Sequence, residues 1–413
     1  MNLTAMGKAA RAASMRLNTF GTAQKDAVLA AMADALLAHT DEILAANALD
    51  MASADENGVA KAMMDRLRLD EGRVASMAKG LRDVIALSDP TAEGEGSVTR
   101  PNGLIIAKRR VPLGVIGIIF EARPNVTADA IGLCVKSGNA CILRGGKEAI
   151  HSNLAIAKVM NDAAVAAGYP EGGIQILSDT SRETAAEMMR LNGYIDVLIP
   201  RGGAGLIQSV VKNATVPVIE TGVGVCHTFI DASADFDMAL KIIINAKCSR
   251  PSVCNAMETL LIHKDIADEF LPLAFGELEK QNVELRCCEA SLPYAKNGVA
   301  ASAQDYYTEY NDYVLNVRVV EDLAAAISHI AEHSTRHSEA IVTKDYANAQ
   351  SFLNMVDAAA VYVNASTRFT DGGEFGLGAE IGISTQKLHA RGPMGLKELT
   401  TYKYVVYGDG QIR

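Results

Sequence analysis

Residues 115–147 read VIGIIFEARPNVTADAIGLCVKSGNACILRGGK, and this stretch decides the fold class. The β-branched run Val115–Phe120 predicts a buried strand, and the spacing of apolar residues in 128–135 predicts the helix that follows it. Cys141–Leu143 then predicts a second strand, which ends in an Arg-Gly-Gly-Lys turn. A strand–helix–strand unit of this kind favours a parallel sheet with helices packed against it.

The same alternation continues toward the C-terminus. Further short apolar runs predict strands at 174–177, 196–199, 216–219, 228–230, 259–262, 314–320, 340–342 and 360–363, with helices between them. Repeated units predict an α/β protein with two doubly wound parallel-sheet domains. The segment 370–382 is too rich in glycine for a helix or a strand, so it is predicted to be a functional loop.

The flanking segments differ from this alternation. The first ninety or so residues are dominated by helix-forming residues at helical spacing. Pro101-Asn102-Gly103 predicts a turn between strands at 96–100 and 104–110. The run Tyr402–Tyr407 predicts a strand with no partner nearby in the sequence, and we expect it to complete the sheet of another subunit.

The composition excludes several classes of protein. The 413 residues suggest two or three domains, and 49 acidic against 39 basic side chains argue against nucleic acid binding. No apolar run approaches the ~18–20 residues of a membrane-spanning helix, and the N-terminus lacks an export signal. The odd number of cysteines, seven, favours reduced thiols and a cytoplasmic location. Without a C-x-x-C pair or an HExxH motif, no metal site is expected.

The cysteine loop Cys248-Ser-Arg-Pro-Ser-Val-Cys254 is the first candidate for chemistry. A thiolate is the reactive form of cysteine, and Arg250 together with backbone N–H groups favours it. Cys134 and Cys141 lie in apolar segments, so they are expected to be buried and inert. The residues alone do not separate Cys254 from Cys248 as the nucleophile.

Two glycine turns are candidates for nucleotide binding. Leu143–Lys147 and Pro200–Gly205 each follow a predicted strand and precede a helix, where glycine lets a dinucleotide approach the backbone. Neither is a full G-x-G-x-x-G motif, and each alone fits a plain turn equally well. Two such turns on one parallel sheet favour the nucleotide interpretation. Arg144 and Lys147 fit a phosphate, which favours NADP over NAD.

Two polar residues have two interpretations each. Asn125, in the segment Phe120–Thr127, is either a helix N-cap or an amide that donates to an oxyanion. Glu220, in the segment Ile219–Gly224, is either a general base or a structural acceptor for loop N–H groups.

Together these segments resemble the aldehyde dehydrogenase superfamily over essentially the whole chain. The stretches that carry the resemblance occur in this order: VIGIIFEARPN (115–125), LRGGKE (143–148), IPRGG (199–203), IETG (219–222), RPSVCNA (250–256) and TDGGEFGLGAEIG (370–382). The sequence is most similar to the branch that reduces L-glutamate 5-phosphate to L-glutamate 5-semialdehyde with NADPH, the second step of proline biosynthesis from glutamate.

The resemblance implies catalytic roles for three residues. Cys254 matches the nucleophile that forms a thioester, and Asn125 matches the amide that binds the oxyanion together with the Cys254 backbone N–H. Glu220 matches the base that hydrolyses the thioester in oxidising relatives. Because hydrolysis would waste the intermediate in a reductase, we expect Glu220 to assist proton handling or structure.

The resemblance also implies how NADP(H) is held. Arg144 matches a cofactor-binding lysine, Lys147 stands where a cation would meet the 2′-phosphate, and Glu309 matches a ligand of the nicotinamide ribose. Gly202 and Gly203 match the pair under the pyrophosphate.

The substrate contacts rest mainly on chemistry. Arg123 and Arg250 are predicted to contact phosphate or carboxylate, since guanidinium groups bind both in a bidentate manner. Gly372 and Gly373, in the glycine-rich loop, are predicted to hold the amino and carboxylate groups of the substrate.

The resemblance implies three structural parts. These are an NADP-binding domain (1–93 and 112–225), a catalytic domain with Cys254 (226–398) and a small β oligomerisation element (94–111 and 399–413). A homo-oligomer acting on a small molecule, with neither nucleic acid nor membrane as a partner, is expected, and contact with glutamate 5-kinase is left open. The alternatives are a CoA-acylating or other aldehyde dehydrogenase, and a non-catalytic nucleotide-binding protein.

Overall fold

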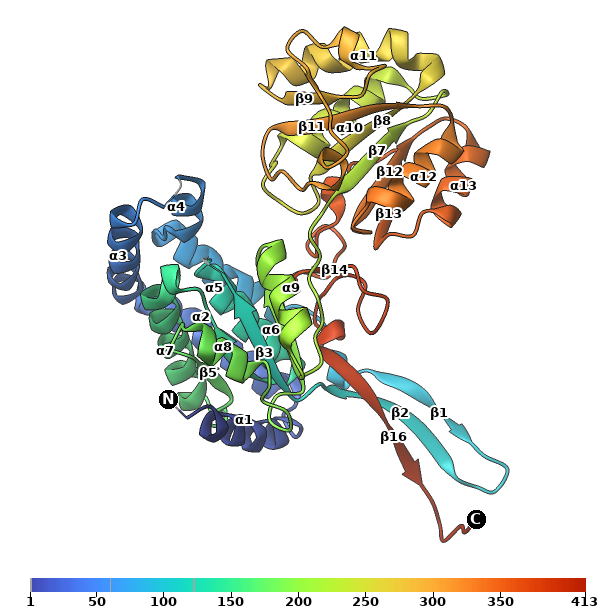
Figure 1. The fold of residues 1–413 in the computed structure, drawn as a ribbon. Helices are drawn as coiled ribbons and strands as arrows, with labels where there is room; N and C mark the ends of the chain where they lie inside the picture. The colour runs from blue at the N-terminus through green and yellow to red at the C-terminus, as the bar shows by residue number, and fades with distance from the viewer. Residues whose placement is uncertain (1, 60, 122) are drawn as a thin grey trace. The chain divides into compact units, whose positions relative to one another are not determined.

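The computed structural model describes residues 2–59, 61–121 and 123–413, which form two compact units (Figure 1). Unit 1 comprises the chain up to Thr221 together with Gly376–Gly382 and Met394–Arg413. Unit 2 comprises Gly222–Phe375 and Ile383–Pro393. The chain therefore leaves unit 1 at Gly222, returns to it for Gly376–Gly382, enters unit 2 again and ends in unit 1. The sequence-based prediction places residues 226–398 in one domain.

The N-terminal part of unit 1 is helical, as predicted. Its helices are α1 (Leu3–Leu17), α2 (Thr22–Ala38), α3 (Thr40–Glu56), α4 (Lys61–Leu67) and α5 (Glu71–Ile85). Asn2 and Asp70 cap α1 and α5 by accepting hydrogen bonds from backbone N–H groups of the first turn. Helices α2, α3 and α5 pack on α6 (Asn125–Ser137) or α7 (Ile150–Ala166), which themselves contact the sheet.

Unit 1 contains a four-stranded parallel sheet in the order β5-β4-β3-β6. Its remaining elements are β3 (Val115–Phe120), β4 (Ala140–Arg144), β5 (Ile174–Ile176), α8 (Arg182–Met188), β6 (Val197–Arg201) and α9 (Ala204–Asn213). The strand order reverses between β3 and β6, which confirms the doubly wound prediction. The predicted strand at 216–219 was wrong: only a bridge between Leu198 and Val218 forms, because Pro217 has no N–H for a ladder.

A three-stranded antiparallel sheet extends from unit 1 in the order β1-β2-β16 (Figure 1). The predicted hairpin is confirmed as β1 (Gly94–Thr99) and β2 (Ile105–Pro112). The C-terminal strand β16 (Thr400–Tyr407) pairs with β2 of its own chain, from Thr400 opposite Pro112 to Tyr407 opposite Ile105. The partner of this strand is thus distant along the chain, where no local pattern in the sequence indicates it, and completion of another subunit's sheet stays a prediction.

Unit 2 contains a seven-stranded parallel sheet in the order β10-β9-β11-β8-β7-β12-β13. Its elements are β7 (Cys226–Ile230), α10 (Phe236–Cys248), β8 (Met257–His263), α11 (Lys264–Lys280), β9 (Glu284–Cys287), β10 (Val299–Ala300), β11 (Val314–Val320), α12 (Leu323–His333), β12 (Ser338–Val342), α13 (Tyr346–Met355) and β13 (Ala360–Val363), followed by the short pair β14 (Ile383–Ser384) and β15 (Gly392–Pro393). The strand order reverses between β7 and β12.

Both faces of the seven-stranded sheet are buried. Ile230 and Leu260 belong to a core with residues of α10 and α11, such as Phe270. Their neighbours Phe229 and Leu261 point to the other face and belong to a second core with α12 and α13. Helices on both faces explain why the strands of this sheet read as continuous apolar runs in the sequence.

Short 3-10 turns connect several of these elements. They are η1 (Pro90–Ala92), η2 (Lys147–Ala149), η3 (Leu292–Tyr294), η4 (Asp305–Tyr307), η5 (Thr367–Phe369) and η6 (Lys397–Leu399). Among the described helices, none combines the length and the apolar character needed to cross a lipid bilayer.

Candidate active site

The residues predicted to bind the cofactor in unit 1 follow strands of the four-stranded sheet. Arg144 ends β4 and Lys147 begins η2, while Gly202 and Gly203 come directly after β6. Asn125 opens α6 after β3. Because the carboxyl ends of parallel strands meet at one edge, the structure brings these residues to the same edge of the sheet, where the strand order reverses.

The turn after β6 binds a carboxylate of its own chain. The backbone N–H of Gly203, at the N-terminus of α9, donates to Oε2 of Glu121 at 2.8 Å. A Cβ atom at Gly202 would lie 2.6 Å from the same carboxylate and 2.8 Å from Leu206, so this close approach depends on glycine. The turn therefore donates a hydrogen bond to a negatively charged oxygen, as binding of a dinucleotide's pyrophosphate requires. Glu121 had no predicted role, although it lies within the motif that carries the resemblance.

The two cations after β4 differ in their surroundings. Arg144 is half-buried, donates to the backbone carbonyl of Thr180, and has a pKa that burial lowers from its ordinary value. Its Nε is buried without a hydrogen-bond partner among the described residues. Lys147 is exposed to solvent at the start of η2. This arrangement fits one anchored and one accessible cation around a phosphate group.

Asn125 is not a helix N-cap. Pro124 is the N-cap of α6, and Asn125 is the first helical residue. Its side-chain amide is exposed and donates to Oδ2 of Asp129 at 3.1 Å, one turn further along the helix. The capping interpretation was therefore wrong. Asp129 was missed by the sequence reasoning, although the i, i+4 spacing would have indicated the pair.

Two further predicted residues of unit 1 have no role that the structure tests. Arg123 is exposed, and its backbone N–H donates to the carbonyl of Glu121, with Ala122 between them outside the described residues. Glu220 is half-buried beside Thr221, whose hydroxyl donates to the carbonyl of Pro200 at 2.7 Å. Their roles in substrate binding and proton handling stay predictions.

Cys254 lies in the loop between α10 and β8, at the amino edge of the seven-stranded sheet. A fully buried ion pair joins the two ends of this loop: Nζ of Lys247 lies 2.6 Å from Oε2 of Glu258. Burial raises the pKa of Glu258 to about 7, although the Lys247 ammonium opposes the shift. The pair fixes the positions at which the loop leaves the helix and enters the strand.

The backbone of Cys254 contacts the segment around the start of β7. The thiol of Cys226 donates to the carbonyl oxygen of Cys254 at 3.2 Å. A Cβ atom at Gly224 would lie 1.4 Å from that same oxygen, so only glycine fits there. The N–H of Gly224 in turn donates to Oε1 of Glu309 at 2.7 Å. Glu309 therefore supports the nucleophile loop within unit 2, while its predicted contact with the nicotinamide ribose stays a prediction.

Asn255 holds the same loop through hydrogen bonds to a second segment of unit 2. Its side-chain amide donates to the carbonyl of Thr370 at 3.0 Å, and its backbone carbonyl accepts from the hydroxyl of Thr367 at 2.7 Å. The guanidinium of Arg368 also donates to the side-chain oxygen of Asn255. The loop that carries Cys254, the predicted nucleophile, is thus held by polar contacts on two sides.

The charges around the thiol favour Cys254 over Cys248. Burial and the positive charge of Arg250 lower the pKa of Arg368, whereas Asp371 and Cys254 oppose that shift, so the guanidinium group of Arg368 acts within reach of the thiol. Nearby cations stabilise a thiolate. At Cys248, by contrast, burial raises the thiol pKa. Arg368 was missed in the sequence, where a single arginine before the glycine-rich loop gave only a weak signal.

The glycine-rich loop divides between the two units. Gly372 and Gly373 lie in unit 2, where Oδ1 of Asp371 accepts a hydrogen bond from the N–H of Gly373 at 2.8 Å. The second half packs on unit 1, where a Cβ atom at Gly378 would lie 2.5 Å from Leu87. The predicted substrate contacts of this loop, including those of Gly372 and Gly373, stay predictions.

No described group of histidine, cysteine, aspartate and glutamate residues is arranged to hold a metal ion.

The chain matches the model of the aldehyde dehydrogenase family over residues 2–287. It is 60% identical over 407 residues to the γ-glutamyl phosphate reductase of Clostridium perfringens (strain 13 / Type A), covering 98% of both chains. It is 59% identical over 411 residues to that of Heliobacterium modesticaldum, covering 100% of this chain and 99% of the relative.

A solved structure extends the likeness to three dimensions. The crystal structure of γ-glutamyl phosphate reductase from Thermotoga maritima is similar to this chain with a TM-score of 0.97 and 49% sequence identity. The match covers 100% of both chains. The likeness therefore includes both units and the three-stranded sheet.

Proposed function

The chain belongs to the aldehyde dehydrogenase family, in the branch of the γ-glutamyl phosphate reductases, and on this premise we propose that it reduces L-glutamate 5-phosphate to L-glutamate 5-semialdehyde and phosphate with NADPH. This reaction is the second step of proline biosynthesis from glutamate. The proposal includes a covalent thioester on Cys254.

One observation carries the chemical part of the proposal. Cys254 lies in a loop whose backbone is held by Cys226 and Gly224, with the guanidinium group of Arg368 acting on its thiol. A fixed thiol near a cation suits a nucleophile that attacks an anionic acyl donor. A buried, structural cysteine would need neither feature.

In the first proposed step, the thiolate of Cys254 attacks the acyl carbon of L-glutamate 5-phosphate. The carbon–sulfur bond forms, the carbon–oxygen bond to phosphate breaks, and the electron pair leaves with inorganic phosphate. Arg250 and Arg368 are assigned to the negative charge of the substrate, because guanidinium binds phosphate and carboxylate in a bidentate manner. The amide of Asn125 and the N–H of Cys254 are assigned to the oxyanion, with about 3–4 kcal/mol per donor.

The second proposed step returns the thiol. When bound, NADPH supplies the hydride that brings the acyl group to the aldehyde level. The carbon–sulfur bond then breaks, and Cys254 takes the electron pair and is ready for another cycle. Glu220 is assigned to proton handling or structure, since activating water against the thioester would release glutamate instead of the semialdehyde.

The cofactor assignments rest on the edge of the four-stranded sheet. The N–H of Gly203 donates to an anionic oxygen, and a pyrophosphate oxygen would take the place that the carboxylate of Glu121 holds beside Gly202. Arg144 and the exposed Lys147 would hold the phosphates, with Lys147 meeting the 2′-phosphate that distinguishes NADPH from NADH. Glu309 would contact the nicotinamide ribose only by exchanging its bond to Gly224 or by using its second oxygen.

Self-association through the three-stranded sheet is part of the proposal. Strand β16 forms an edge of that sheet and exposes Tyr402, Tyr404, Val406 and Tyr407, with between 49% and 63% of each residue accessible. An exposed apolar edge strand readily pairs with another chain. A homo-oligomer built on this strand would cover these side chains.

The test is an absorbance assay of NADP⁺ reduction with L-glutamate 5-semialdehyde and inorganic phosphate. We expect wild-type activity to require phosphate, Cys254→Ala to abolish it, and Cys248→Ala to retain it, because the thiol of Cys248 is disfavoured as a thiolate. Oxidation that proceeds equally without phosphate but requires coenzyme A would replace the acyl phosphate with a CoA thioester. Full activity of Cys254→Ala would remove the thioester mechanism altogether.

A further inference from the structure

A cavity of about 260 Å³ lies in unit 1 where the three-stranded sheet meets the helices. Its walls come from the end of α1, the start of α2, the turn η1, strand β2 and Lys403 of β16. It is separate from the carboxyl edge of the four-stranded sheet, and neither the proposed catalysis nor the proposed cofactor site uses it. Its volume suits a small ion or metabolite and is too small for a dinucleotide.

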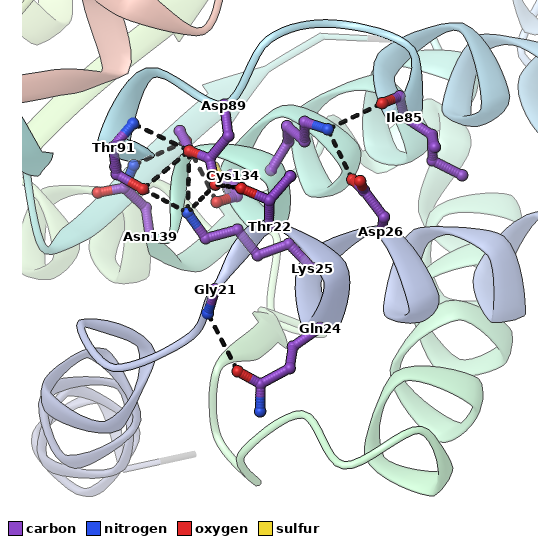
Figure 2. A network of polar contacts seen from close by, with 12 residues as sticks. Gly21, Thr22, Gln24, Lys25, Asp26, Ile85, Asp89, Thr91, Cys134 and Asn139 are labelled. Atoms are coloured by element: carbon purple, nitrogen blue, oxygen red, sulfur yellow. Dashed lines mark hydrogen bonds and ion pairs between the residues drawn. The ribbon is translucent and has the colours of Figure 1, made fainter. Parts of the chain in front are cut away.

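The one carboxylate among the lining residues is already neutralised. Figure 2 shows the buried Nζ of Lys25 between Asp89 and Thr91, at 2.9 Å from Oδ2 of Asp89 and 2.6 Å from the hydroxyl of Thr91. The hydroxyl of Thr22 donates to the same carboxylate at 3.0 Å. Asp89 therefore contributes little net negative charge to the cavity, since a buried ammonium and hydroxyl groups surround it.

Cations dominate the opposite wall. Lys403 of β16 stands directly opposite Arg109 of β2 in the antiparallel register, and both residues line the cavity with Arg110. Like charges in directly opposed positions destabilise a strand pair. Among the described side chains, neither Arg109 nor Lys403 forms an ion pair with a carboxylate. The guanidinium of Arg110 is turned toward Thr400, donating to its hydroxyl at 3.0 Å.

We propose that this cavity is a binding site for inorganic phosphate, held between Arg109 and Lys403. A dianion there would relieve the repulsion between the two opposed cations, and the planar guanidinium of Arg109 suits its oxygens. In a chain with a formal charge of -10, two opposed cations on one cavity wall, with the carboxylate of Asp89 already paired to Lys25, form an uncommon local environment. Because the walls belong to α2, β2 and β16, occupation would tie the three-stranded sheet to the helical part of unit 1.

The experiment is a calorimetric titration of the full-length protein with sodium phosphate, against sodium chloride at matched ionic strength. We expect saturable binding of phosphate, weakened about tenfold or more in Arg109→Gln/Lys403→Gln, since each lost contact is a charge-assisted hydrogen bond. The matched control is Lys108→Gln. Lys108 is the neighbour of Arg109 on β2 but lies over the ring of Tyr402, outside the cavity lining. We expect this control to bind phosphate as the wild type does.

A second control separates this cavity from the cations beside Cys254. Arg250→Gln should retain the site, because Arg250 belongs to unit 2. The proposal is overturned if chloride reproduces the titration, if the double variant binds phosphate as the wild type does, or if Arg250→Gln abolishes binding. Should the double variant not fold, each single variant is expected to weaken binding by about threefold or more. The titration needs no turnover, so a failure of the proposed reductase activity would leave its result intact.

Discussion

The two parallel sheets place their candidate functional residues at opposite edges. In unit 1 the candidate cofactor residues follow β3, β4 and β6 at the carboxyl edge, where the strand order reverses. In unit 2 the loop of Cys254 precedes β8, at the amino edge. The same doubly wound architecture thus serves two different kinds of site.

The carboxyl edge of the seven-stranded sheet shows why unit 2 departs from the usual rule. At the reversal between β7 and β12, the carboxylate of Asp231 accepts hydrogen bonds from Thr343 at 2.6 Å and from Asn348 at 3.1 Å. Burial would raise the pKa of Asp231, but these hydrogen bonds hold it below its ordinary value. At the position where a doubly wound sheet normally offers a crevice to a ligand, these polar side chains thus bind one another.

Strand order therefore indicates only one of the two candidate sites. The rule about carboxyl ends finds Arg144, Lys147 and the glycines after β6, because those residues follow strands directly. It does not find Cys254. That site depends on loops that converge on the amino edge, held by Gly224, Cys226 and Asn255.

The largest effect on activity is expected at Gly224, where a side chain would collide with the loop that carries Cys254. Gly224→Ala would drive a Cβ atom into the carbonyl of Cys254 and displace the nucleophile, so we expect a loss of about 100-fold or more in kcat/KM. The matched control is Gly276→Ala on α11, where a Cβ atom meets nothing within 4 Å. Steady-state kinetics and circular dichroism of both variants separate lost activity from lost folding; an active Gly224→Ala enzyme would contradict the support that Gly224 gives to Cys254.

A smaller effect is expected at the carboxyl edge of the four-stranded sheet. Lys147→Glu removes the cation proposed for the 2′-phosphate, so the KM for NADPH should rise by about tenfold or more while the KM for NADH changes little. Lys158→Glu on α7, an exposed residue paired with Asp162, serves as the control for a reversed charge in the same unit. Equal changes for both cofactors would refute the contact with the 2′-phosphate.

The smallest effect concerns the free energy of unfolding, whose dependence on pH is expected to differ between the two units. Burial lowers the pKa of His329 to about 2 and that of His337 to about 4, and both residues belong to unit 2. Below about pH 6.5 these histidines take up protons only when unfolded, so the stability that they contribute to unit 2 is complete above that pH and is lost below it. Glu258, whose folded pKa is raised to about 7, takes up its proton in the folded state over the same range and offsets part of this loss. The loss approaches about 1.4 kcal/mol per histidine for each pH unit down to the folded pKa.

Hydrogen exchange at pH 7.5 and pH 5.5, read separately for peptides of the two units after correction for intrinsic exchange, tests this difference. Protection should fall at the lower pH in β7 and β12 more than in β3 and β4. His329→Phe should reduce the difference between the two pH values. Equal losses in both units would show that the buried histidines of unit 2 do not set its sensitivity to acid.

Much of the fold was predictable because its signals are local. The apolar run of β3, the spacing of α6 and the glycine turn after β4 lie within 33 consecutive residues, and together they specify a strand–helix–strand unit. The turn at Pro101–Gly103 likewise specifies the hairpin of β1 and β2. The run at 216–219 failed as a strand because Pro217 removes a ladder donor, a local fact that outweighed the apolar character of its neighbours.

By itself, then, the sequence determined the alternation of strands and helices, the two glycine turns and the cysteine loop, since each depends on residues adjacent along the chain. Only the tertiary structure decided that β16 pairs with β2, that Gly224 and Cys226 lie beneath Cys254, and that Arg368 acts on the same thiol. Those contacts join residues that are distant in the chain. Their formation depends on the packing of whole units, a free energy that no short window of sequence contains.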